Sequence, residues 1–162
     1  MTQQEYENEI KELKERLEKL ETSKVEVDKP KRWKPKDKGT YWLIDTYGNV
    51  GDTTWNDDDY DKWKYITGNC FETKEEAEEY KKQIEYTARY KNYIEEHSEP
   101  LDWFDTEQAK FYVLYGEDRI IFDECYLFKG MDIYASSEEI IKDAIEEIGE
   151  DNFKKYVLGV KW

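Results

Sequence analysis

The sequence predicts an α+β protein in which an N-terminal coiled-coil helix is followed by two small antiparallel sheet-plus-helix units. Three observations predict this class: an apolar seam of heptad spacing at the start of the chain, and two later segments in which aromatic and β-branched runs lead into a capped helix. The chain has 162 residues, the length of one ordinary domain or of a small domain with an appended helix. Its 14 Tyr, 6 Trp and 6 Phe supply more buriable area than disordered chains carry, so a folded chain is expected.

The first segment, residues 1–23, carries apolar residues at alternating spacings of four and three, which is the a and d pattern of a coiled coil. In a parallel pair, Glu9 would face Lys14 of the other chain and Arg16 would face Glu21, so both contacts join opposite charges. We therefore expect a homo-oligomer formed through residues 1–23; a helix laid on its own domain is the alternative, because fewer than four heptads are present. The seam residues are Ile10, Leu13, Leu17 and Leu20.

Residues 24–38 contain Pro30 and Pro35 and carry seven Lys or Arg against three acids. This composition favours an extended basic linker. Its cations surround Trp33, so phosphate contacts and base stacking are the alternative use of this segment.

Residues 39–98 are expected to form the first hairpin and helix unit. Aromatic and β-branched residues flank Tyr47-Gly48-Asn49, which predicts a tight turn between two strands. We expect residues 55–69 to form a loop. The spacing of Thr73 and Glu76 is that of a capping box, which starts a helix that Ser98-Glu99-Pro100 ends.

Residues 99–162 repeat this plan as a β-meander and helix unit. Strands are expected at 111–115, 120–122 and 125–128, followed by a helix whose cap is Ser136. Aligning Thr73 with Ser136 gives a constant offset of 63 between the two helix starts. Internal duplication and a coincidence of common helix-start chemistry both remain open. The final segment, from Asp151, is expected to add a turn of helix and a last strand.

The charge of the chain limits its partners. The formal net charge of −15 repels nucleic acid and anionic membranes and attracts basic protein surfaces. No apolar run approaches the roughly 18 residues that a membrane span needs, and no apolar signal segment follows Met1. With only Cys70 and Cys125 present, a reduced cytoplasmic setting is expected.

No catalytic, metal or cofactor site is expected, so the chain is predicted not to be an enzyme. Read from Asp57, the acidic stretch fails as a calcium loop, because Lys62 stands where a glycine is needed and Gly68 stands where a glutamate is needed. His97 is the only histidine and is explained by a helix C-terminus. Two cysteines and one histidine do not make a common zinc set, and no glycine-rich phosphate loop is present.

The stretch WNDDDYDKW, residues 55–63, is the candidate partner-binding site. A solvated loop anchored by its aromatic residues is the simpler interpretation. The functional interpretation is a surface on which closely spaced carboxylates imitate phosphates and aromatic rings supply rigid contact area. The residues concerned are Trp55, Asp57, Asp58, Asp59, Tyr60, Asp61 and Trp63.

The segments RWKPKDKGTYWLIDTYGNV and KYITGNCFETKEEAEEY resemble a module found in small accessory proteins of phages and prophages of Gram-positive bacteria. The second half, from Leu101 to Asp151, is similar to the longer members. The resemblance transfers no catalytic residues. It implies a viral anti-defence role in the cytoplasm of a bacterial host, in the manner of anti-CRISPR proteins.

These observations together predict a non-enzymatic acidic inhibitor of a host defence protein that has a basic nucleic-acid-binding surface, such as a CRISPR effector. One alternative is a coiled-coil scaffolding accessory protein. Another is a nucleic-acid-associated factor that uses the basic linker. Added salt distinguishes the first from the second, because it weakens charge-driven binding and leaves apolar contacts largely unchanged.

Overall fold

The structure, a computed structural model, describes residues 10–16, 32–127, 130 and 133–161 and divides the chain into two units, Met1–Trp33 and Lys34–Trp162. In the first unit, residues 10–16 are helical and the side chains of Ile10 and Leu13 are exposed. Leu17 and Leu20, the other residues of the predicted seam, lie outside the described residues. The coiled coil therefore stays a prediction.

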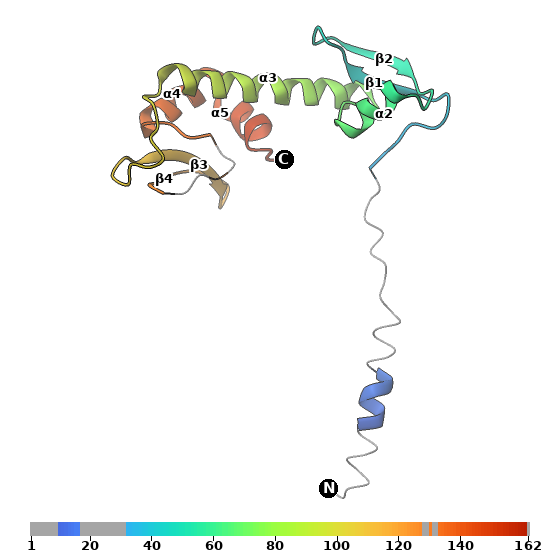
Figure 1. Cartoon of the computed structure of the whole chain (residues 1–162), viewed down its shortest axis with the longest axis horizontal. Helices are drawn as coiled ribbons and strands as arrows, with labels where there is room; N and C mark the ends of the chain where they lie inside the picture. The colour runs from blue at the N-terminus through green and yellow to red at the C-terminus, as the bar shows by residue number, and fades with distance from the viewer. Residues whose placement is uncertain (1–9, 17–31, 128–129, 131–132, 162) are drawn as a thin grey trace, which may run out of the picture. The chain divides into compact units, whose positions relative to one another are not determined.

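The second unit is α+β, as the sequence predicts. It contains two antiparallel hairpins, and in Figure 1 these lie near opposite ends of the long helix α3. Its elements are β1 (Thr40–Ile44), β2 (Val50–Thr54), α2 (Asp59–Ile66), α3 (Lys74–His97), β3 (Lys110–Gly116), β4 (Arg119–Cys125), α4 (Glu138–Ile148), α5 (Glu150–Asn152) and the π-helix η1 (Phe153–Val157).

The first hairpin confirms the predicted turn. β1 pairs with β2 from Thr40 opposite Thr54 to Ile44 opposite Val50. In the turn, the Asp45 carboxylate accepts hydrogen bonds from the backbone amides of Tyr47 and Asn49, at 2.8 Å each. Gly48 has a φ of +80°, which glycine adopts without the penalty that a side chain would bring.

The expectation of a loop at residues 55–69 is wrong, because α2 occupies its centre. Asp58 is the N-cap of this helix, and its side chain accepts a hydrogen bond from the amide of Asp61. Asp59 and Asp61 lie in the first turn, where carboxylates interact favourably with the helix dipole. Asp58, Asp59 and Asp61, which the sequence favours as loop residues, therefore form a helix start.

The start of α3 is as predicted. Thr73 accepts a hydrogen bond from the Glu76 amide, and the Glu76 carboxylate accepts one from the Thr73 amide, which completes the capping box. α3 ends at His97 and Ser98 caps it, so the predicted stop at Ser98-Glu99-Pro100 is also confirmed.

The second helix start is shifted by one residue from its prediction. The cap of α4 is Ser137, whose hydroxyl accepts from the Ile140 amide, whereas Ser136 bonds to the Glu99 amide. The N-caps of α3 and α4, Thr73 and Ser137, are therefore 64 residues apart. At that offset Phe71, which bridges to Trp42 of β1, corresponds to Ala135, which bridges to Phe111 of β3.

The third strand expected at 125–128 and the strand expected at the C-terminus do not form in the described residues. β4 ends at Cys125, and Tyr126 and Leu127 make a bend, while Phe128 lies outside the described residues. After η1 the chain runs on to Lys161 without strand pairing. The predicted β-meander is a two-stranded hairpin.

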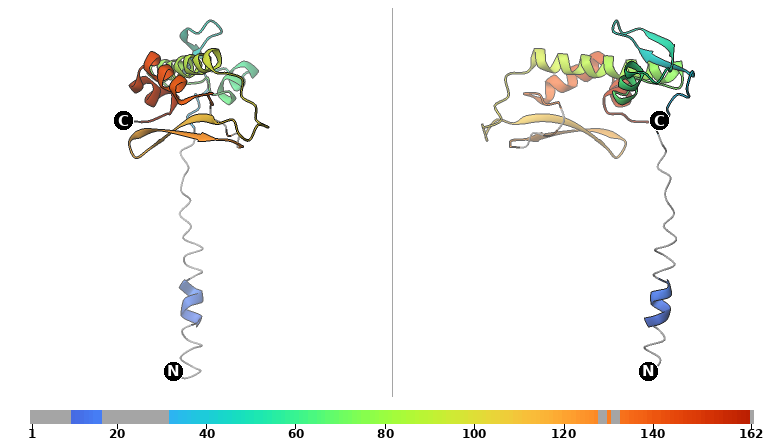
Figure 2. Two further views of the ribbon diagram at one scale, coloured as in Figure 1. Left: turned by 90° about the vertical axis from the view of Figure 1, so that its left-hand side faces the viewer. Right: turned by 45° about the vertical axis from the view of Figure 1, so that its right-hand side comes forward.

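The main core lies between α3, α4, η1 and the inner face of the β3–β4 hairpin, and Figure 2 shows these elements from two further sides. The rings of Tyr90 in α3 and Phe153 in η1 pack with their centroids 4.9 Å apart. Burial raises the pKa of Tyr90 above its usual value. The buried residues of this core are Tyr90, Ile94, Val113, Ala135, Ile141, Ala144, Ile145, Ile148 and Phe153.

Candidate functional site

Two of the seven residues in the predicted partner-binding stretch are buried. Trp55 and Asp61 are each 2% exposed. The Asp61 carboxylate accepts hydrogen bonds from the Tyr41 hydroxyl, at 2.8 Å, and from the Asn56 amide. Burial, followed by this bond to Asp61, raises the pKa of Tyr41. Trp55 and Asp61 therefore stabilise the fold and are not available to a partner. The predicted binding surface is left with Asp57, Asp58, Asp59, Tyr60 and Trp63.

Asp57 is exposed but does not present an isolated charge. It has a φ of +56°, a conformation that Asp tolerates better than most residues. Its carboxylate lies 3.6 Å from the Lys34 ammonium and 4.0 Å from that of Lys62. One carboxylate oxygen of Asp58 caps α2 by accepting a hydrogen bond from the Asp61 amide. The negative charge of this stretch is thus smaller than its four aspartates indicate.

α2 exposes three large apolar side chains beside the charged Asp59 and Lys62. Tyr60 is 55% exposed, Trp63 58% and Ile66 76%. The Lys64 ammonium lies 5.2 Å from the centre of each of the Tyr60 and Trp63 rings, which holds the two rings beside one cation. The sequence interpretation missed Ile66, although its spacing of three from Trp63 would have placed it there once a helix was expected. We call this surface the α2 corner and define it as Asp57, Asp58, Asp59, Tyr60, Trp63 and Ile66.

The last residues of the predicted basic linker pack against the segment that precedes α2. The Lys34 ammonium lies 4.9 Å from the centre of the Trp55 ring, and the Lys38 ammonium donates to the Asn56 side chain at 2.9 Å. Pro35 is buried. Residues 34–38 are therefore packed against the end of β2, whereas Lys29 and Lys31 lie outside the described residues.

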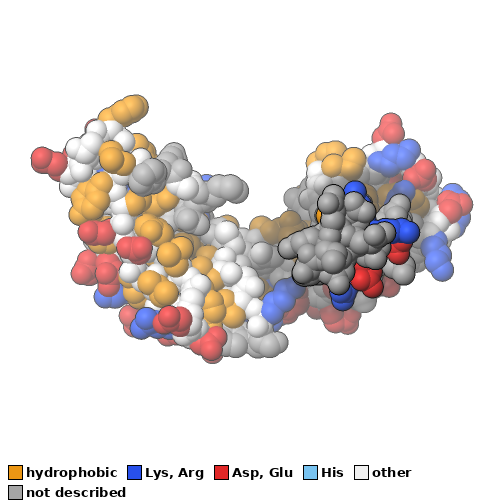
Figure 3. All heavy atoms as spheres, turned by 90° about the horizontal axis from the view of Figure 1, so that it is seen from below, with side chains coloured by type: hydrophobic (Ala, Val, Ile, Leu, Met, Phe, Trp, Pro, Cys, Tyr) orange, Lys and Arg blue, Asp and Glu red, His pale blue; other side chains and the backbone are white. Residues whose placement is uncertain are grey.

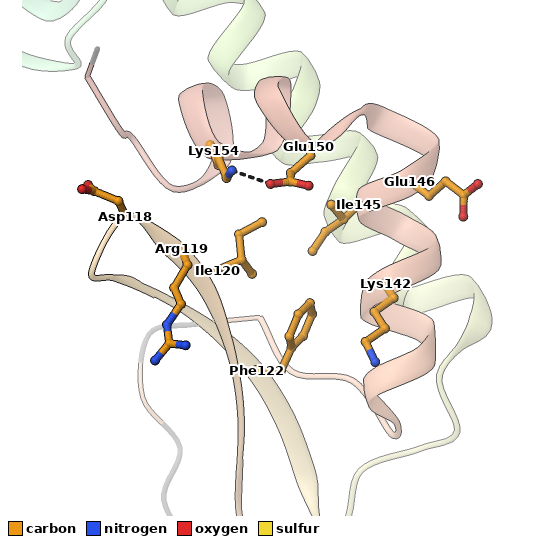
Figure 4. Close-up of a pocket in the computed structure, with 9 residues that line it drawn as sticks. All are labelled: Asp118, Arg119, Ile120, Phe122, Lys142, Ile145, Glu146, Glu150 and Lys154. Carbon is orange, nitrogen blue, oxygen red and sulfur yellow. Dashed lines mark ion pairs between the residues drawn. The ribbon is translucent and has the colours of Figure 1, made fainter.

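A hollow of about 820 Å³ lies between β4 and helices α4 and α5, and Figure 4 shows the side chains that line it. Its apolar part comes from Ile120, Phe122 and Ile145. Its lysines are paired: Lys154 with Glu150, and Lys142 with Glu138 at 2.6 Å. These pairings raise the pKa of both lysines above the usual value, so both ammonium groups stay charged at neutral pH.

The other candidates for chemistry are explained by structure. The His97 ring stacks on Tyr93 with centroids 4.0 Å apart, and its Nδ1 lies 2.8 Å from the Tyr93 carbonyl at the end of α3. Cys70 is buried and Cys125 is half-buried. In the part of the chain that the structure describes, no group of three or more His, Cys, Asp or Glu is placed to hold a metal ion.

Fold and surface together define a small acidic α+β protein that exposes aromatic side chains next to carboxylates. Comparison with known proteins gives no matching family model, no matching curated protein and no matching solved structure. Among the described residues, no helix combines the length and the apolar character needed to cross a bilayer.

Proposed function

We propose that this chain is a non-enzymatic acidic inhibitor that binds a host defence protein on its basic nucleic-acid-binding surface, with a CRISPR effector as the leading example. The observation that carries the proposal is the α2 corner, where exposed Tyr60, Trp63 and Ile66 stand beside exposed carboxylates. The resemblance of the sequence to phage accessory proteins supports the same class of function.

The chemistry of the corner fits such a partner. Protein interfaces favour aromatic anchors surrounded by a charged rim, and truncating such anchors causes the largest losses of affinity. A net charge of −15 speeds the approach to a basic groove and disfavours contact with nucleic acid itself.

Carboxylates alone would fill only a small part of a nucleic-acid groove. Duplex DNA carries a charge about every 1.7 Å along its axis, and the corner offers three exposed aspartates, one of them paired with lysines. Glu75 and Glu76 in the first turn of α3 add exposed acids nearby in the chain. We therefore assign most of the binding energy to the aromatic side chains, and assign orientation and partner choice to the charges.

The test is a competition assay. Fluorescently labelled duplex DNA is bound to each of a panel of purified CRISPR effectors from Gram-positive bacteria, and the chain is added at low and at high salt. We expect the chain to displace the DNA at low salt. For the double variant Tyr60→Ala/Trp63→Ala, the concentration that displaces half of the DNA should be at least about tenfold higher.

Tyr47→Ala is the matched control, because Tyr47 is 88% exposed on the β1–β2 turn and lies outside the corner. It should compete as the wild-type chain does. The proposal fails if the wild-type chain displaces no DNA at micromolar concentration, or if the double variant competes equally well.

A scaffolding role is the second candidate, because Ile10 and Leu13 are exposed on the helix at residues 10–16. A coiled coil would bury both side chains in an apolar seam. An assembly held in this way should persist when salt is raised, whereas inhibition through the α2 corner should weaken.

A further inference from the structure

The loop that follows α3 carries a further exposed aromatic residue and is held in place by hydrogen bonds. Phe104 is 95% exposed. The Asp102 carboxylate accepts a hydrogen bond from the Phe104 amide at 2.8 Å, and the Asp105 carboxylate accepts from the Glu107 amide at 2.8 Å. The Gln108 side chain closes the loop by accepting from the Asp102 amide at 2.7 Å and donating to the Pro100 carbonyl. Phe104 is therefore presented by an ordered backbone.

Lys110 clamps this loop from beneath. Its side chain is fully buried, and its ammonium donates to the carbonyls of Asp105 and Gln108, at 2.7 Å each, and to that of Tyr126 at 3.1 Å. The Lys110 ammonium thus links the loop before β3 to the chain that follows β4. Phe104 and Leu127 are the sequence neighbours of the two residues that it joins, Asp105 and Tyr126. Leu127 is 61% exposed.

The clamp adjoins the outer face of the β3–β4 hairpin. Lys110, Tyr112 and Leu114 alternate along β3 and so share one face, on which Leu114 lies opposite Ile121 of β4. The other face, which carries Phe111 and Phe122, packs against the core. Figure 3 views the molecule from below, where hydrophobic side chains gather over the lobe that contains this hairpin, with acidic and basic side chains at its margin.

The segment that forms this face is acidic, which favours one kind of occupant. Residues 99–127 contain eight acids and two bases, a net charge of −6, and one of the bases is the buried Lys110. A second copy of the chain would bring the same negative charge and be repelled. A segment with apolar side chains set between lysines or arginines would satisfy both the exposed rings and the acids.

We propose that this face is a docking surface for a basic, amphipathic segment of a partner protein, with Phe104 as its anchor. The surface consists of Phe104, Tyr112, Leu114, Ile121 and Leu127, and we call it the clamped-loop surface. It shares no residue with the α2 corner and stands independently of the proposed function. Because the clamp orders the loop before binding, little conformational entropy is lost when a partner engages Phe104.

The probe is a synthetic peptide of alternating leucine and lysine, labelled with a fluorophore and titrated with the full chain. A lysine-only peptide of equal charge and a leucine–glutamate peptide are the comparison probes. We expect the leucine–lysine peptide to bind the full chain more tightly than either. In the amide NMR spectrum its binding should shift the signals of residues 103–105, 112–114, 121 and 126–127.

Phe104→Ala should weaken this binding about tenfold or more, because a well-placed aromatic anchor supplies a large share of the affinity. The variant should keep its stability, since the side chain is 95% exposed. Tyr47→Ala, which removes an equally exposed ring from the other hairpin, should bind as the wild-type chain does.

Repeating the titration in the Tyr60→Ala/Trp63→Ala chain separates this surface from the α2 corner, so either proposal can fail alone. Undiminished binding in that chain, together with loss on Phe104→Ala, supports the clamped-loop surface. Equal affinity of the Phe104→Ala chain, equal affinity for the lysine-only peptide, or shifts confined to residues 57–66 would overturn it.

Discussion

Replacing Asp61 by alanine tests whether this carboxylate belongs to the fold or to a binding surface. The side chain is 2% exposed and accepts from the Tyr41 hydroxyl and the Asn56 amide. Its removal leaves the buried Tyr41 hydroxyl and the partly buried Asn56 amide without an acceptor, and each such donor costs about 1–3 kcal/mol. We therefore expect the free energy of unfolding to fall by about 4 kcal/mol, which is a large fraction of the ~5–15 kcal/mol of a typical domain.

Asp59→Ala is the matched control, because Asp59 lies in the same first helical turn but is exposed. Only its interaction with the helix dipole is lost, about 0.3–1 kcal/mol. Tyr41→Phe removes one of the two bonds to Asp61 and should cost about 1.5–3 kcal/mol, which keeps the test informative if Asp61→Ala does not fold.

The measurement is urea unfolding followed by tryptophan fluorescence, with the slope of the transition compared between variants. If Asp61→Ala and Asp59→Ala agree to within about 0.5 kcal/mol, the carboxylate is not the buried acceptor that the structure shows, and the charge-mimic interpretation of all four aspartates returns.

Three further outcomes are expected. Thr73→Ala and Ser137→Ala should each lower the free energy of unfolding by about 1 kcal/mol, because each removes a helix cap. If Ser136→Ala lowered it and Ser137→Ala did not, Ser137 would not be the N-cap of α4. The pKa of Glu79 is lowered from 4.5 to about 2, chiefly by the Lys155 ammonium 2.7 Å away, so the stability that Glu79 contributes is complete above about pH 4.5 and is lost as the pH falls toward 2. Between these pH values the free energy of unfolding of Glu79→Gln should therefore depend less on pH than that of the wild-type chain, and an unchanged acid-unfolding profile would refute this. Deleting residues 1–23 should turn an oligomer into a monomer by light scattering, and a monomeric full chain at micromolar concentration would exclude the coiled coil.

Local chemistry made the first hairpin and the start of α3 predictable. A Gly-Asn turn between β-branched runs and a threonine three residues before a glutamate each act over a few residues, so the sequence is enough to place them. The cap of α4 was placed one residue early because Ser136 and Ser137 are adjacent and either could cap a helix. The Ala135–Phe111 bridge and the bond from the Glu99 amide to Ser136 decide between them, and these contacts join residues 24 and 37 positions apart.

The candidate site was harder to predict because its burial depends on distant partners. Asp61 looks like its neighbours in the sequence, and it is the Tyr41 hydroxyl, 20 residues away on β1, that makes it a buried acceptor. Lys110 is a stronger case, since its ammonium is surrounded by two carbonyls of the preceding loop and by the carbonyl of Tyr126, 16 residues away. A lysine in an exposed-looking strand gives no sign of this in its local sequence.

The length of α3 has a consequence for how a partner could engage this protein. The helix has 24 residues and so extends about 36 Å at 1.5 Å per residue. The first hairpin joins the chain just before the first turn of α3 through the Trp42–Phe71 bridge, and the second shares a core with Tyr90 and Ile94 of its later turns. Figure 1 shows the two hairpins near opposite ends of α3. This helix separates the two hairpins, so the two proposed surfaces lie on different parts of the second unit. A partner that offered contacts at both places would gain the affinity of a two-point attachment, and one whose contacts were spaced differently would be held at a single end.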